Sequence, residues 1–395
     1  MTLIAILCFY TAIFSLISYI QIQFLEKQKL KKAFILEDEA YKNAANIAIE
    51  NEKFKIFSNF YTLIINMLWI AFGFFYLKKI LIHSNSILEN TLFLLLFLII
   101  TSLLNLPLNL YENFVKNKKQ GFSNMTLMLF IKDGIKSLIL LVIFGFLILY
   151  ALLFFYNYFG AFWWIIAFIF SFVVILIINV IYPILIAPLF NKMQKLNDEN
   201  LLNQITSLMH KCGFNANGIY VIDASKRDKR LNAYFGGLFK SKRVVLFDTL
   251  LKALSQKELL AVLGHELGHF VHKDIIKFLF INALVMFILF FLFANLPNFV
   301  YEESHLTDVD AGVFLLLLIF GNVFSFIVAP LVNLLSRNNE FNADQYGAKM
   351  TSKNDMKSAL ITLAKENKAF VKSSRIYTFF HLSHPSISDR LKALD

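Results

Sequence analysis

Long apolar runs separated by short polar segments set the pattern of this 395-residue chain. Seven runs lack Asp, Glu, Lys, Arg and His, and each has about the 20 residues that a helix needs to cross a bilayer. They extend from Leu3 to Leu25, Phe60 to Leu77, Leu92 to Leu110, Ser137 to Phe159, Ala161 to Leu189, Phe278 to Leu296 and Val313 to Leu335. The pattern predicts an α-helical, polytopic membrane protein with seven transmembrane helices.

The loops between these runs differ in charge. Lysines crowd the loops after the first and third runs, whereas the acidic loop from Pro297 to Gly312 holds no Lys or Arg. Because basic loops stay in the cytoplasm, seven crossings place the N-terminus outside and the C-terminus in the cytoplasm. The polar segment between the fifth and sixth runs then lies on the cytoplasmic side.

Two polar stretches, 191–274 and 337–395, follow the fifth run. The first contains β-like sequences, GIYVIDA from Gly218, NAYFGGL from Asn232 and KRVVLF from Lys242, which predict a small sheet. We therefore divide the chain into an N-terminal membrane region with five helices, 1–190, and a second region, 191–395, that includes the last two helices at about 278–296 and 313–335. Its two cytoplasmic segments must fold together as one small α+β unit.

Asparagines interrupt the apolar runs. Such residues either join helices by hydrogen bonds or line a hydrated chamber, and both interpretations stay open. Six of these positions are Asn66, Asn105, Asn179, Asn282, Asn322 and Asn333.

Composition supports the membrane assignment, because 58% of the residues are hydrophobic and 16% are charged. A soluble domain does not bury so much apolar surface. The net charge of +11 raises the question of nucleic acid, but the basic residues flank apolar runs and form no stripe with interleaved aromatics, so no nucleic-acid partner is expected. Cys8 and Cys212 lie in different kinds of segment, and no disulfide framework is expected.

The segment AVLGHELGHF, Ala261 to Phe270, contains the spacing H-E-x-x-H. On a helix, His265 and His269 share one face and can bind one ion, with Glu266 beside them as a base. This arrangement is typical of a catalytic zinc site, so we expect one Zn²⁺ per chain. Two incidental histidines on an amphipathic helix are the alternative. The preceding Ser255-Gln-Lys-Glu258 is a capping box that begins the helix and explains Glu258 structurally.

A third ligand is available in RNNEFNADQYG, which begins at Arg337. Glu340 and Asp344 lie four residues apart, so a helix presents both carboxylates on one side. We expect Glu340 to bind the metal and Asp344 to accept the free N–H of a ligating histidine. A solvated acidic helix face is the alternative.

Five segments together resemble the zinc-dependent CAAX prenyl proteases, which are integral-membrane metalloendopeptidases. The resemblance implies a chambered barrel of seven helices, with His265, His269 and Glu340 on zinc and Glu266 as the catalytic acid/base. It also implies that Asp344 is a catalytic residue beside the ligands, a carboxylate sometimes assigned a proton-donor role. The segments are YPILIAPLFNK from Tyr182, SKRDKRLNAYFGGLFKSKRVVLFDTLL from Ser225, HELGH, SRNNEFNAD from Ser336 and SHPSISDRLKAL from Ser383.

Four further residues are candidates. Asn232 is a hydrogen-bond donor for substrate if NAYF is an edge strand, with Tyr234 nearby, although Asn is also common in turns. His384 is a catalytic candidate that would stabilise an oxyanion. The alternative is a histidine with a purely structural role. Arg390 is a candidate for binding substrate. The alternative is a solvated or ion-paired residue on the last helix.

The resemblance implies removal of the last three residues that follow a prenylated cysteine, so the partners would be a peptide or lipidated-protein substrate and the bilayer. The bias toward Phe, Ile, Lys and Asn is typical of an AT-rich genome and favours a bacterial inner membrane, with the endoplasmic reticulum membrane as the eukaryotic alternative. Quality-control cleavage of unprenylated substrates is the competing function. A metal-regulated transporter or a non-catalytic scaffold is the competing class, and the oligomeric state stays open.

Overall fold

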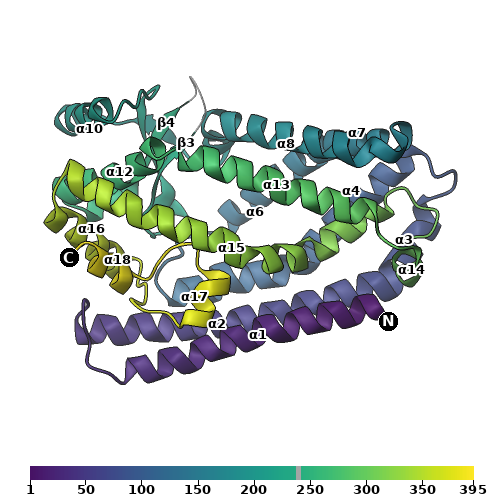
Figure 1. The fold of residues 1–395 in the computed structure, drawn as a ribbon, viewed down its shortest axis with the longest axis horizontal. Helices are drawn as coiled ribbons and strands as arrows, with labels where there is room; N and C mark the ends of the chain where they lie inside the picture. The colour runs from purple at the N-terminus through teal and green to yellow at the C-terminus, as the bar shows by residue number, and fades with distance from the viewer. Residues whose placement is uncertain (237–241) are drawn as a thin grey trace.

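A computed structural model describes residues 1–236 and 242–395 (Figure 1). Seven helical segments are long and apolar enough to cross a membrane, as the hydropathy pattern predicts. Four of the crossings contain a π-helical turn between two α-helical parts. The segments are α1 (Thr2–Lys29), α2–η1–α3 (Asp38–Leu81), α4–η2–α5 (Ile87–Lys119), α6–η3–α7 (Leu127–Tyr158), η4–α8–η5–α9 (Gly160–Phe190), α13 (Asp274–Ala294) and α15 (Gly312–Met350).

A small sheet of four strands follows the fifth crossing, in the order β1-β2-β4-β3. β2 and β4 are parallel, and the outer strands are antiparallel to their neighbours. NAYF is therefore an edge strand, as predicted, whereas β1 was not predicted. The end of the predicted NAYFGGL run lies outside the described residues. The strands are β1 (Met193–Lys195), β2 (Ile219–Ile222), β3 (Ala233–Gly236) and β4 (Arg243–Phe247).

Shorter helices complete the polar part of the molecule. One face of the sheet packs on α10, α12 and α16 through a shared apolar core that includes Val244, Leu246 and Leu263. A separate core joins the membrane helices around Phe74, Phe93 and Leu153. The shorter elements are α10 (Glu199–Lys211), η6 (Ala224–Lys226), α11 (Asp248–Ala253), α12 (Gln256–Val271), α14 (Asn298–Glu303), α16 (Lys353–Glu366), α17 (Arg375–His381) and α18 (Ile387–Ala393).

Helix α15 connects the two parts. It has 39 residues, which corresponds to about 58 Å, far more than the apolar run from Val313 to Leu335 requires. Its last turns run beside α12 (Figure 1). The helix that crosses the membrane therefore continues rigidly into the polar unit and carries Glu340 and Asp344 there.

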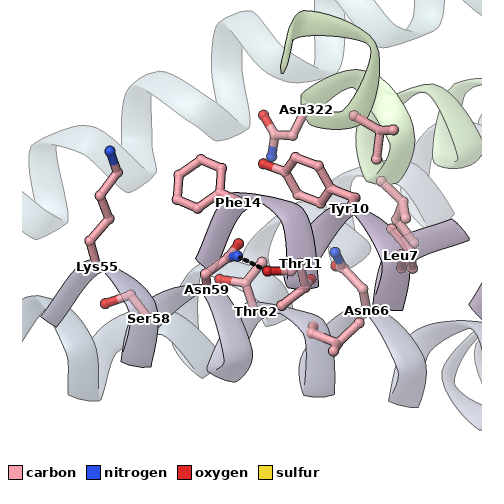
Figure 2. Close-up of a pocket in the computed structure, with 13 residues that line it drawn as sticks. Leu7, Tyr10, Thr11, Phe14, Lys55, Ser58, Asn59, Thr62, Asn66 and Asn322 are labelled. Carbon is pink, nitrogen blue, oxygen red and sulfur yellow. Dashed lines mark hydrogen bonds between the residues drawn. The ribbon is translucent and has the colours of Figure 1, made fainter. Parts of the chain in front are cut away.

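The asparagines of the crossings make three kinds of contact. Asn105, Asn179 and Asn282 each donate to the carbonyl four residues earlier in their own helix. Asn66 and Asn322 instead line a polar cavity of about 240 Å³ between α1, α2 and α15, together with Tyr10 and Thr62 (Figure 2). Asn333 joins α15 to α17, because its side chain donates to the Phe380 carbonyl at 2.9 Å. The helix-joining interpretation therefore applies to Asn333 and the chamber-lining one to Asn66 and Asn322, whereas the three intrahelical asparagines fit neither.

Candidate metal centre

The helix that carries H-E-x-x-H begins where the sequence predicts. Ser255 caps α12, and the Glu258 side chain accepts the Ser255 backbone N–H at 2.9 Å. The second Glu258 oxygen accepts hydroxyl hydrogen bonds from Ser358 and Thr362 of α16. Glu258 thus fixes both the start of α12 and its position against α16.

Glycines allow α12 and α15 to approach backbone to backbone. A Cβ at Gly347 would lie 2.9 Å from the His265 nitrogen, and one at Gly268 would lie 3.0 Å from the Ala343 Cα. A Cβ at Gly264 would meet the Gly347 Cα at 3.2 Å. Since these neighbours are backbone atoms of a packed helix, a side chain would push the helices apart. The close approach brings Glu340 to the two imidazoles.

His265, His269 and Glu340 meet at one point, as the sequence predicts. Ligand atoms of the three residues lie within 4.8 Å of one another. The Nε2 atoms of His265 and His269 lie 3.5 and 3.4 Å from the two carboxylate oxygens of Glu340. Glu340 and His265 are buried, whereas the His269 side chain is 21% exposed.

Each imidazole is oriented through its other nitrogen. The Nδ1 atom of His265 lies 2.8 Å from Asp344, as the spacing predicts, and that of His269 lies 2.9 Å from Asp274. Sequence reasoning missed Asp274. Lys273 adopts a left-handed φ of 56°, which reverses the chain so that the first turn of α13 returns to His269. A carboxylate five residues after the second histidine was the available signal.

Arg390 is a partner of Asp344. Its Nε and Nη2 atoms lie 2.8 and 2.6 Å from the two oxygens of that carboxylate, and its side chain is 11% exposed. This geometry matches the ion-paired alternative for Arg390. The bidentate pair holds Asp344, which in turn holds His265.

The other candidates lie at different distances from the metal ligands. His384 lies beside them, with its Nε2 atom 3.2 Å from Glu340. Asn232 lines a cavity of about 220 Å³ together with Glu266 and Arg390, and its side-chain oxygen accepts the Ala233 N–H. Tyr234 packs with Val245 in the core on the opposite face of the sheet, and among the described residues it lines neither cavity that contains Glu266.

The chemistry of the donor set fits a metal cation. Within the described residues, one buried oxygen of Glu340, Oε2, has no hydrogen-bond partner although it faces His265. Burial opposes protonation of His269, but its hydrogen bonds to the Glu340 and Asp274 carboxylates outweigh burial and raise its pKa to about 9. Burial also raises the pKa of the Glu266 carboxyl. The surroundings therefore favour positive charge between the imidazoles and Glu340.

Two histidines and a glutamate form a metal site here, and a further glutamate lies beside them. The site lies at the end of membrane helices. These features define a membrane-embedded metallopeptidase. The comparisons agree with this class. Residues 195–395 match peptidase family M48, and residues 21–192 match the CAAX prenyl protease N-terminal region, which is described as five membrane helices.

Whole proteins match over almost the full chain. The CAAX prenyl protease 1 of Saccharomyces cerevisiae is 34% identical, covering 96% of this chain and 92% of its own. The CAAX prenyl protease 1 homolog of Homo sapiens is 32% identical, covering 91% and 87%. The crystal structure of S. mikatae Ste24p superimposes with a TM-score of 0.90 at 32% identity, covering 99% of this chain and 97% of that chain. The chain belongs to the CAAX prenyl protease 1 group of peptidase family M48, and it is a metalloendopeptidase.

Replacing Gly347 by alanine tests the helix contact. We expect Gly347→Ala to bind much less metal and to lose about 1–3 kcal/mol of stability, because the new Cβ meets the backbone of α12. Gly321→Ala is the matched control, since it lies on α15 with nothing described within 4 Å of its Cβ position. Metal content and thermal unfolding in detergent measure both variants. A Gly347→Ala protein with wild-type metal content would contradict the argument.

Replacing Asp274 by asparagine tests the second imidazole contact. Loss of the carboxylate that orients His269 should weaken metal binding about 10- to 100-fold. Chelator competition measures the affinity. Asp308→Asn is the control, because its left-handed backbone suits asparagine and it lies in the loop before α15. Equal affinities for the two variants would show that Asp274 does not support the metal site.

Proposed function

We propose that this protein is a zinc protease that cuts the peptide bond after a prenylated cysteine and releases the C-terminal tripeptide of its substrate. The observation that carries the proposal is the meeting of His265, His269 and Glu340 at one point, with Glu266 beside them. The names of the yeast and human relatives support the substrate class.

Zinc is the metal that the donor set favours. Imidazole nitrogens and a carboxylate oxygen, three ligands in total, form a catalytic zinc site with one position free for water or substrate. His265, His269 and Glu340 would hold one ion per chain, with Asp344 and Asp274 fixing the imidazoles. When bound, zinc polarises the scissile carbonyl and lowers the pKa of water.

Different side chains around this site carry out the separate steps of hydrolysis. Glu266 takes a proton from the attacking water, whose oxygen bonds to the carbonyl carbon, and returns the proton to the leaving nitrogen as the C–N bond breaks. His384, next to Glu340, stabilises the oxyanion. Asn232 and the free edge of β3 hold the substrate backbone as an added strand. Tyr234 supports β3 from the opposite face, and Arg390 acts through Asp344 rather than on substrate.

We further infer that the metal site faces the cytoplasm, with the N-terminus outside. The lysine-rich first and third loops support this orientation. A division of the chain near residue 190 is supported by the ranges 21–192 and 195–395 that match two different families. The complete ligand set argues against a non-catalytic scaffold.

Glu266→Gln tests the role of the base. The variant should lose about 10²- to 10⁴-fold in kcat because the attacking water keeps its proton. It should keep its metal, since Glu266 is not a ligand. Peptide cleavage and metal content are measured together. Glu258→Gln is the control on the same helix, because glutamine also completes a capping box. Wild-type activity in Glu266→Gln would overturn the assignment.

A matched pair of peptides tests the substrate class. We expect a farnesylated CAAX peptide to be cleaved with a kcat/KM at least about tenfold above that of the same peptide without the lipid, because only the first buries a large apolar group. Mass spectrometry identifies the released tripeptide. Equal cleavage of both peptides would favour the quality-control function, which the AT-rich composition suggests.

A further inference from the structure

A large apolar cavity begins at the metal ligands. Its volume is about 1,230 Å³, above the range of about 300–1,000 Å³ that is usual for ligand sites. Glu266, His269, Glu340 and His384 line one end. Most of the remaining lining residues are aliphatic or aromatic. We call this cavity the apolar slot.

Two membrane helices form the long walls of the apolar slot. On α8 the lining residues recur at helical spacing from Phe172 to Ile181, a length of about 14 Å. Facing them are Ile275, Ile276, Phe278 and Leu279 of the first turns of α13. Further from the metal site the helices touch, because the rings of Phe168 and Phe287 lie 5.5 Å apart. The slot therefore lies between this contact and the metal ligands.

The walls of the apolar slot include apolar side chains that no other described part of the chain covers. Ile177 is 52% exposed, and Ile275 and Ile276 are 41% and 63% exposed. These side chains lie a few turns from the metal ligands. A ligand that covers them must be hydrocarbon where it contacts α8 and α13.

Among the described residues, the charged side chains that line the slot lie on the polar unit or at the start of α13. Lys242, Lys273 and Asp274 lie with the metal ligands, and Lys242 also stands over the rings of Phe214 and Phe270 at 5.3 and 4.4 Å. A ligand that fits this cavity is therefore a peptide near the metal ligands and a hydrocarbon chain between α8 and α13. The prenyl thioether of the proposed substrate has this form.

Connectivity sets where that chain must start. The peptide bond that is cut follows the prenylated cysteine. The thioether sulfur therefore lies only three covalent bonds from the carbonyl carbon that the water attacks. We propose that the apolar slot between α8 and α13 binds the isoprenoid chain of the substrate and measures its length. This inference rests on the proposed function and adds the location and the length selection.

A bulky residue placed halfway along the slot tests the proposal. Leu176→Trp shortens the slot, and Ile178→Trp is the matched control, because Ile178 lies on the same helix but does not line the slot. The substrates are one CAAX peptide in unprenylated, geranyl, farnesyl and geranylgeranyl forms. Leu279→Trp, with Phe280→Trp as its control, repeats the test on the facing helix.

For Leu176→Trp we expect the KM of the farnesyl and geranylgeranyl peptides to rise about tenfold or more, while the geranyl and unprenylated peptides change less than about twofold. Ile178→Trp should leave all four KM values unchanged. The proposal is contradicted if Leu176→Trp changes the KM of all four peptides equally, or if Ile178→Trp produces the same change in KM. A wild-type enzyme that cleaves all four peptides equally instead overturns the proposed function, and the slot with it.

A direct measurement covers the case in which the tryptophan variants do not fold. A farnesyl-peptide analogue with a diazirine on its last isoprene unit is bound to Glu266→Gln and irradiated. Cross-links on the lining residues of α8 or α13 support the slot. Cross-links confined to other helices overturn it, as would occur if a bilayer lipid filled the slot and the isoprenoid lay elsewhere.

Discussion

The contact between α12 and α15 is the constraint on which the site depends. Neither helix alone has three metal ligands, because α12 supplies two histidines and α15 supplies Glu340. A carboxylate side chain is short, so the helix axes must approach until backbone atoms meet. Gly264, Gly268 and Gly347 provide this approach. The glycines of the motif therefore have a structural role as definite as that of its histidines.

Charge balance at the site follows from the same packing. Asp274, Glu340 and Asp344 surround the imidazoles, and Lys277 and Arg390 pair with Asp274 and Asp344. With neutral imidazoles, the Glu340 carboxylate keeps a buried oxygen to which no described residue donates a hydrogen bond. Buried charge without a partner is costly, so a divalent cation both completes the coordination and stabilises the fold.

Local patterns predict much of this structure. The seven crossings follow from hydropathy, and the His265–Glu340–Asp344 relation follows from i, i+4 spacing and the needs of the metal. Asp274 was missed because its contact depends on a left-handed turn at Lys273, which the sequence does not reveal. The three-residue strand β1 is too short for an alternating pattern. Tyr234 was predicted to lie near substrate with Asn232, but it packs on the far face of the sheet, because neighbouring residues of a strand point to opposite faces and Ala233 lies in the core on the other side.

Helix α13 shows why the membrane and the metal site cannot be separated. Its first residue, Asp274, holds His269, and the side chains of its next turns form a wall of the apolar slot. Asp274 is 2% exposed and lies 2.9 Å from His269 of α12, so the start of the helix is fixed on the polar unit. A shift of α13 in the bilayer would therefore move both the slot wall and the carboxylate that orients the second imidazole. Within one helix, the surface that contacts hydrocarbon is thus mechanically linked to the geometry of the metal ligands.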